Sequence, residues 1–215
     1  MAIWEQVVEI LRGSIFVYAQ ACGGNLGGGI LAVTLLARLA LFPLTLRVAR
    51  LSAAHQERMR QLKPELDALR RRFKDDPRRQ AEETRRAYAR AGVSLVPRAG
   101  CLGMLVQTPV LLALFSAVRS VSALGGRFLW LGSIARPDLI LAVVVAALTG
   151  AAVALGPQSV PQGRTLLIIL PTVVTLVALS QMASGIGLYW GVSSAGSLVQ
   201  AVVLRRERRL LESAG

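Results

Sequence analysis

One charged position deep in an apolar segment constrains this chain more than any other feature. Arg38 lies inside Leu26–Leu46, a 21-residue run that is otherwise apolar and long enough to cross a bilayer as a helix. At ~1.5 Å per residue, Arg38 is only ~3 Å from the middle of the run. An arginine at that depth costs roughly 2.5–3.5 kcal/mol and cannot escape the cost by losing its proton. We therefore expect water or polar partners around it; snorkelling to a headgroup, which is hard to reach from mid-depth, is the alternative.

The composition indicates a helical membrane protein with one basic side. The chain is 53% hydrophobic and carries a net charge of +13, a combination that is unusual for a soluble domain. Most of the excess charge lies in Arg47–Ala99, which holds 15 Lys or Arg and 7 Asp or Glu. By the positive-inside rule such a block marks the cytoplasmic side, so the charge requires no specific nucleic-acid sequence as a partner.

Hydropathy and helical periodicity predict an all-α polytopic membrane protein with five transmembrane helices and a cytoplasmic helical hairpin between the first two. The predicted segments are an interfacial amphipathic helix and turn (1–25), a first span (26–46), the cytoplasmic hairpin (47–99), a second span (100–118), an extracytoplasmic loop (119–138), a third span (139–155), a fourth span (165–181), a fifth span (185–204) and a basic cytoplasmic tail (205–215). This division places 20 Lys or Arg on the cytoplasmic side and 4 on the other. It predicts an external N-terminus and an internal C-terminus.

Two segments before the second span carry amphipathic patterns. In the N-terminal helix, Ile3, Val7, Ile10, Leu11 and Ser14 share one face. The first span is expected to end near Pro43-Leu-Thr45, and the first arm of the hairpin then shows an apolar seam in which Pro64 predicts a kink or a restart. The seam consists of Met59, Leu62, Leu66, Leu69 and Phe73. Asp75-Asp76-Pro77 is a turn and cap signal before a second arm at 78–91. Its predicted inward face is Ala81, Thr84, Tyr88 and Ala91.

The residues missing from the spans argue against catalysis. The five predicted spans contain no Asp or Glu, and the single histidine, His55, lies in the hairpin. Proton-coupled transport, intramembrane proteolysis and haem ligation each need such groups, so we expect no enzyme activity, no cofactor and no metal site. Cys22 and Cys101 fall on opposite sides of the membrane, which argues against a disulfide; lipidation of Cys22 is an alternative fate.

The fifth span carries polar and small residues on two separate faces. Trp190, Ser193, Ser197 and Gln200 form one helical stripe, while Gly187, Gly191 and Ala195 form another that suits close helix packing. We expect the polar stripe to line a hydrophilic groove that contains Arg38. The predicted groove residues are Arg38, Thr34, Gln107, Trp190, Ser193, Ser197 and Gln200. For each Ser or Thr alone, a hydrogen bond to its own helix backbone is the competing interpretation. A positive groove without an acidic partner suits an acidic peptide, a lipid headgroup or a small anion.

Several motifs, in the same order, resemble the YidC/Oxa/Alb family of membrane protein insertases. They are Ala37–Thr45, Met59–Leu66, Gly100-Cys101 followed by Gln107–Phe115, and Gly187–Trp190 with Ser193, Ser197 and Gln200. The resemblance runs from about Gly28 to Arg206. Gly103-Met104 and Ala183-Ser184-Gly185 depart from the family pattern, which has a proline at each place.

The resemblance implies five helices around a hydrophilic groove in which Arg38 receives the leading part of a client. It also implies an apolar slide along which the client's hydrophobic segment leaves. The slide residues would be Met104, Leu105, Leu111, Leu112, Phe115, Leu170 and Leu176. The hairpin would receive incoming chains. The implied partners are nascent membrane proteins and the lipid bilayer, with the Sec translocon, the signal-recognition machinery and the ribosome as further candidates.

The expected function is therefore a membrane protein insertase and chaperone of the minimal five-span form. Two alternatives stay open. A small-anion or lipid transporter would use the same arginine but need access from both faces of the membrane, and no inverted repeat is visible between the halves. In a structural assembly subunit, Arg38 would pair with an acidic residue of a partner helix. Because no organelle transit peptide is visible, we expect the bacterial inner membrane.

Overall fold

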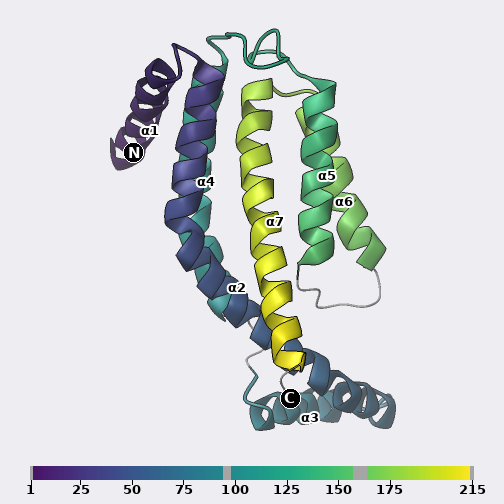
Figure 1. Cartoon of the computed structure of the whole chain (residues 1–215). Coiled ribbons are helices and arrows are strands. Elements are labelled where there is room, and N and C mark those ends of the chain that lie inside the picture. The colour runs from purple at the N-terminus through teal and green to yellow at the C-terminus, as the bar shows by residue number, and fades with distance from the viewer. Residues whose placement is uncertain (1, 94–97, 157–163, 214–215) are drawn as a thin grey trace.

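The computed structural model describes residues 2–93, 98–156 and 164–213, with side chains left out at 2, 98–106, 164 and 211–212. Seven helices account for most of these residues (Figure 1). They are α1 (Ala2–Ala21), α2 (Leu26–Arg72), α3 (Pro77–Arg90), α4 (Arg98–Ser122), α5 (Leu139–Leu155), α6 (Arg164–Leu179) and α7 (Ser184–Ser213). Within the described ranges, the β-structure is a single bridge between Phe128 and Leu131. The all-α prediction is confirmed.

The longest helix, α2, joins two segments that the sequence predicted to be separate. It begins at the cap Asn25, whose Oδ1 accepts a hydrogen bond from the Gly28 backbone N–H at 3.2 Å. It then continues through Pro43 and Pro64 to Arg72. The predicted end of the first span near Pro43 stays a prediction, since a proline removes one backbone hydrogen bond and bends a helix without forcing it to stop, and a helix can continue beyond the membrane. Figure 1 shows this bend, through which one continuous helix supplies both the first span and the first arm of the hairpin.

The bundle is built around α7, which packs against α2, α4 and α5, whereas α6 packs mainly on α5 (Figure 1). The packing stripe predicted on the fifth span faces α5. A Cβ at Gly187 would lie 2.8 Å from Leu141 Cδ2, and one at Gly191 would lie 3.2 Å from Val145 Cγ2. Larger residues would push the two helices apart, so these glycines set the distance between α5 and α7. The helix also continues past the predicted span end into the basic tail.

The N-terminal helix α1 packs on α2 and α4 through a face that adjoins the predicted apolar stripe and shares Leu11 with it. Ile15 and Ala19 are buried, and Gly29 of α2 brings its backbone against them. The stripe residues Ile3 and Ile10 are instead largely exposed. An apolar face left free next to a membrane bundle is suited to contact lipid. The interfacial position of this helix stays a prediction.

The hairpin consists of α3 folded back on the second half of α2. The Asp76 side chain caps α3 by accepting a hydrogen bond from the Arg79 backbone N–H at 3.1 Å. The hairpin's buried residues are Leu62, Leu66 and Ala87, with Leu69 and Tyr88 partly buried beside them. Met59 and Phe73 of the seam are half-buried.

The inward face predicted for the second hairpin arm is partly wrong. Ala81 and Ala91 are exposed, while Thr84 and Tyr88 are half-buried. The buried position is Ala87, which lies one turn after Thr84 and next to Tyr88 and shifts the contact face to one side of the predicted one. Glu65 on α2 and Arg90 on α3 also form an ion pair at 3.0 Å.

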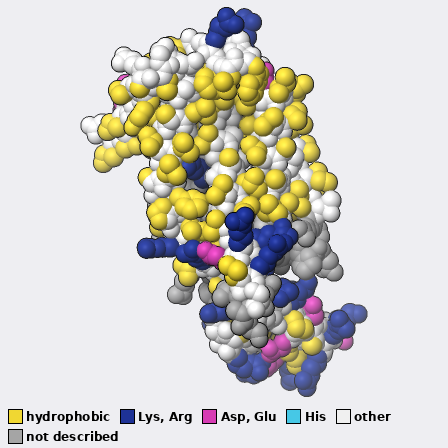
Figure 2. Space-filling model, in the orientation of Figure 1, with side chains coloured by type: hydrophobic (Ala, Val, Ile, Leu, Met, Phe, Trp, Pro, Cys, Tyr) yellow, Lys and Arg dark blue, Asp and Glu magenta, His cyan; other side chains and the backbone are white. Residues whose placement is uncertain are grey.

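The surface is divided between an apolar bundle and a basic end. Figure 2 shows hydrophobic side chains over the helical bundle and Lys or Arg side chains gathered toward the hairpin. By length and composition, Leu26–Arg72 and Ser184–Leu210 can cross a membrane, and the apolar helices Leu139–Leu155 and Thr165–Leu179 are shorter. The exposed apolar residues of α6 alone form a broad face. They are Leu166, Leu167, Ile169, Leu170, Val173, Val174 and Val177. An exposed face of this extent is suited to contact with lipid.

Candidate functional site

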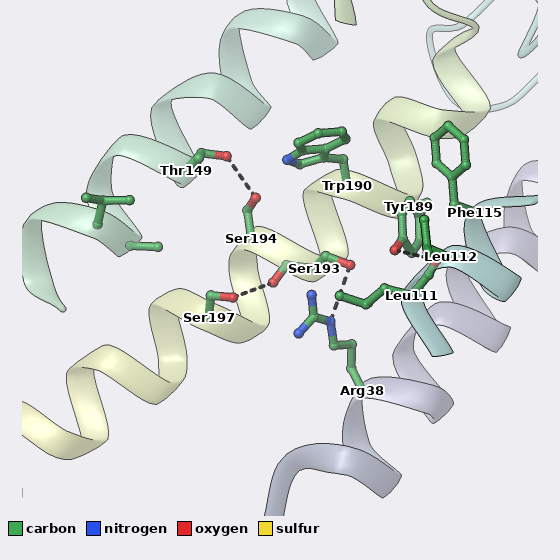
Figure 3. Close-up of a pocket in the computed structure, with 12 residues that line it drawn as sticks. Arg38, Leu111, Leu112, Phe115, Thr149, Tyr189, Trp190, Ser193, Ser194 and Ser197 are labelled. Carbon is green, nitrogen blue, oxygen red and sulfur yellow. Dashed lines mark hydrogen bonds between the residues drawn. The ribbon is translucent and has the colours of Figure 1, made fainter. Parts of the chain in front are cut away.

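A groove opens beside α7 because its two neighbours, α4 and α5, stay apart. In the described part of the chain these two helices make no contact with each other. The cavity between them measures about 580 Å3 (Figure 3). Its lining residues are Arg38 from α2, Leu111, Leu112 and Phe115 from α4, Thr149, Ala152 and Val153 from α5, and Tyr189, Trp190, Ser193, Ser194 and Ser197 from α7.

Arg38 enters this groove from α2 and is the one charged side chain among the described residues that line it. Its Nε donates a hydrogen bond to Ser193 Oγ at 3.3 Å, and Figure 3 shows the guanidinium pointing among the groove residues. Among the residues with described side chains, no carboxylate lies within ion-pairing distance of it. The two terminal nitrogens likewise donate to no described residue. A guanidinium has five N–H donors, so most of them remain available to a visiting group.

The groove has a polar side formed by α7 and α5. Ser194 Oγ and Thr149 Oγ1 lie 2.9 Å apart and share a hydrogen bond across the two helices. Ser197 donates to the Ser193 backbone carbonyl at 3.0 Å, one turn below the contact with Arg38. These hydroxyls give the groove polar groups at several heights along α7 (Figure 3).

The opposite side of the groove is apolar and belongs to α4. Leu111, Leu112 and Phe115 form this wall, and Leu112 is 52% exposed, so it is free to contact a visitor. Tyr189 fixes the wall to α7, because its hydroxyl donates to the Leu111 carbonyl at 3.2 Å. The rings of Tyr189 and Phe115 meet edge-to-face with their centroids 6.4 Å apart. The groove therefore has a positive charge and hydroxyl groups on one side and an apolar surface on the other.

Of the seven predicted groove residues, the structure brings four together in the cavity: Arg38, Trp190, Ser193 and Ser197. The prediction that Thr34 lines the groove is wrong. Its side chain is fully buried, and its hydroxyl donates to the Ile30 carbonyl of the same helix, 2.6 Å away. That bond is the competing interpretation for an isolated threonine.

The two predicted glutamines also lie outside the cavity lining. Gln200 Nε2 donates to the Thr45 carbonyl at 3.4 Å and so bridges α7 to α2. Gln107 is half-buried on α4. The position of each glutamine along its helix follows from the sequence. The direction in which its side chain points depends on how α7 packs against α2 and α4, which sequence spacing does not predict.

The predicted slide residues separate into three groups. Leu111, Leu112 and Phe115 form the α4 wall just described. Leu170 is exposed on α6, and Leu176 packs against the core. Met104 and Leu105 lie outside the residues whose side chains are described. The α4 and α6 portions of the slide do not form one continuous surface within the described residues, because those helices make no contact with each other.

Five lining residues were missed by the sequence analysis: the polar Tyr189, Ser194 and Thr149, and the apolar Ala152 and Val153. Thr149 could have been predicted from the sequence, because every other residue of Leu139–Leu155 is Ala, Gly, Leu, Ile or Val. A lone hydroxyl in such a span faces either its own backbone or another helix, and Thr149 does both, donating to Val145 and contacting Ser194. Ser194 stands next to the predicted stripe, and the close approach of α5 at Gly191 turns it toward Thr149.

Comparison with known proteins places these features in a family context. Residues 17–210 match the family model described as 60Kd inner membrane protein. The chain is 33% identical to membrane protein insertase YidC of Enterococcus faecalis over 218 residues, which cover 94% of this chain and 74% of that protein. It is 31% identical to membrane protein insertase YidC 1 of Halalkalibacterium halodurans over 206 residues, which cover 92% of this chain and 77% of that protein.

A solved structure shares the fold. It is described as an active YidC insertase crystal structure with the first transmembrane domain resolved, and it matches with a TM-score of 0.61 at 24% identity. The match covers 94% of this chain but 45% of that one, so this chain spans less than half of the solved protein.

Proposed function

This chain belongs to the YidC/Oxa/Alb family of membrane protein insertases, and we propose that it guides hydrophobic segments of newly made proteins from the cytoplasm into the bilayer through the groove around Arg38. One observation supports this proposal above the others. An arginine without an acidic partner among the described side chains lies between hydroxyls of α7 and α5 and an apolar wall of α4. That arrangement fits a visitor with a polar or acidic leading end followed by an apolar segment.

In the proposed mechanism, the terminal nitrogens of Arg38 hold the leading end of the client transiently. The serine and threonine hydroxyls replace part of its water shell, which shortens the distance over which polar groups cross the apolar core. The client's apolar segment then passes Leu111, Leu112 and Phe115 into lipid. Transfer of apolar surface out of water, worth about 25 cal/mol per Å2, supplies the driving force. No covalent step is involved.

We further propose an orientation and a set of partners. The hairpin and the basic end of α7 lie in the cytoplasm of a bacterial cell, because Lys and Arg gather there (Figure 2). Nascent membrane proteins enter from that side, and the hairpin receives them together with the targeting machinery. The Sec translocon, the signal-recognition machinery and the ribosome are the candidate partners.

The direct test is insertion of a short, single-span client with an acidic tail in cells depleted of their own insertase. The cells are rescued with the natural chain, Arg38→Lys or Arg38→Ala, each expressed to the same level. We expect the first two to insert the client and Arg38→Ala to fail. Insertion by all three would show that the charge is dispensable, and insertion by none would refute the proposed function.

Site-specific crosslinking locates the client. A photo-reactive residue at Ser197, inside the groove, should capture the nascent client. The same group at Val143, an exposed position of α5, is the matched control and should capture it far less. Equal capture at both positions would mean that the client travels along the lipid-facing surface and not through the groove.

A further inference from the structure

We propose that the turn Phe128–Leu131 inserts Leu129 and Trp130 into the lipid headgroup region and anchors the end of the bundle opposite the hairpin. The turn lies in the connection between α4 and α5, which crosses that end in Figure 1. Its two central side chains are strongly exposed, at 74% for Leu129 and 56% for Trp130. This inference does not depend on the proposed function of the groove.

The backbone conformation of the turn is unfavourable for the leucine at position 129. Leu129 has a φ of +50°, and it is the one non-glycine residue with positive φ in the described chain. A leucine is strained in that conformation, which glycine adopts freely. The same connection uses glycine at its other positive-φ positions, Gly125 and Gly126. Strain retained at an exposed apolar side chain points to a use for that side chain.

Two backbone hydrogen bonds close the turn, and its flanking residues fix it to the bundle with the two central side chains pointing outward. The backbone N–H groups of Phe128 and Leu131 donate to each other's carbonyls at 3.1 and 2.8 Å. On either side of these bonds, Leu131 is buried and Phe128 packs against Gly27 of α2. Farther along, Ile134 is fully buried and its carbonyl accepts a hydrogen bond from Gly185 N–H at the start of α7.

Two observations identify the occupant of this surface as lipid. The apolar outer face of the bundle reaches this end, because Leu139 and Ile140 in the first turn of α5 are about as exposed as Trp130. Arg127 and Arg136 flank the turn with exposed side chains, which complements anionic headgroups. A tryptophan beside apolar and basic residues is the composition found at membrane interfaces.

The test uses Trp130 as its own reporter in the full-length chain. The variant Trp4→Phe/Trp190→Phe leaves it as the single tryptophan. The protein is reconstituted in phosphatidylcholine–phosphatidylglycerol vesicles that contain lipids brominated either near the headgroup or deep in the acyl chain. We expect shallow bromines to quench Trp130 more than deep ones, and iodide in the water to quench it weakly.

Adding Leu129→Gly to this single-tryptophan variant separates anchoring from folding. The glycine relieves the backbone strain, so thermal stability in detergent should stay equal or rise, while quenching by shallow bromines should fall roughly two-fold or more because the leucine contact with lipid is lost. Unchanged bromine quenching in this variant would overturn the proposal. Strong iodide quenching in vesicles that disappears only in native membranes would assign the turn to a protein partner and also overturn it.

Discussion

The sharpest prediction concerns the coupling between Arg38 and an acidic group on the client. Two clients are compared that differ only in their leading tail, one acidic and one in which the acidic residues are replaced by their amides. Each is inserted by the natural chain and by Arg38→Ala. A cycle of this kind isolates the interaction between the two charges from all other effects of either change.

The size of the coupling follows from the geometry of the groove. Two unit charges 4 Å apart attract by ~4 kcal/mol at an effective dielectric of 20 and by ~1 kcal/mol in bulk water. Arg38 is half-buried in a groove, so the expected value lies between these limits, at about 1–2 kcal/mol. This corresponds to an acidic tail being favoured about 5- to 30-fold more strongly by the natural chain than by Arg38→Ala.

The assay is the initial rate of client insertion into vesicles that contain equal amounts of each protein. Arg38→Lys should retain most of the preference, because it keeps the charge although it loses the forked donor geometry. Ser197→Ala is the matched control, since that hydroxyl bonds to its own helix and its removal leaves the charge in place. A coupling of less than about 0.5 kcal/mol, or about two-fold, would refute the assigned role of Arg38.

Two further predictions concern how the helices are held. Gly187→Leu should destabilise the bundle by about 1–3 kcal/mol, because even a Cβ there lies 2.8 Å from Leu141; Gly13→Ala, at a helix position with open space around it, should be neutral or stabilising in the same thermal unfolding measurement in detergent. The hydrogen bond from Arg50 lowers the pKa of Glu207. A carboxylate with a lowered pKa contributes stability above its usual range near 4.5, which is lost as the pH falls further. Contact between α2 and the tail of α7 should therefore loosen in acid, seen as hydrogen exchange there that is faster relative to the intrinsic rate at the same pH. Glu207→Gln should reduce that pH dependence, and the remainder should come from Glu57 of α2, whose pKa is lowered by hydrogen bonds from Arg60 and from Arg208 of α7.

The sequence predicted the helical elements better than their connections. Apolar runs and glycine spacing are local signals, so the sequence predicted both the apolar helix at Leu139–Leu155 and the packing stripe at Gly187 and Gly191. That one helix continues past Pro43 into the hairpin did not follow from the sequence, because a proline indicates a bend and a lost hydrogen bond, whereas continuation depends on packing along the rest of the helix.

The groove was predictable in its charge and in part of its polar side. Arg38 and Ser193 were identified because a charge at mid-membrane and a stripe of hydroxyls on one helix face are both visible in the sequence and both indicate a polar site. Tyr189 and Thr149 were not, because they act across helices. Tyr189 reaches the Leu111 carbonyl and Thr149 reaches Ser194, and such pairs follow from how α4, α5 and α7 are placed.

The distance between α5 and α7 and the distance between α4 and α7 are set by different contacts. This difference explains how the groove stays open. Between α5 and α7, glycines bring the backbones together and Thr149 joins Ser194 by a hydrogen bond. Between α4 and α7, the bulky Tyr189 and Phe115 rings keep the helices apart while the tyrosine hydroxyl fixes their distance. The wall of α4 is thereby held away from α5. Arg38 lies in the space left between them. Among the described residues, no carboxylate pairs with it there and no helix covers it. A client's acidic group can therefore approach Arg38 without first displacing part of the fold.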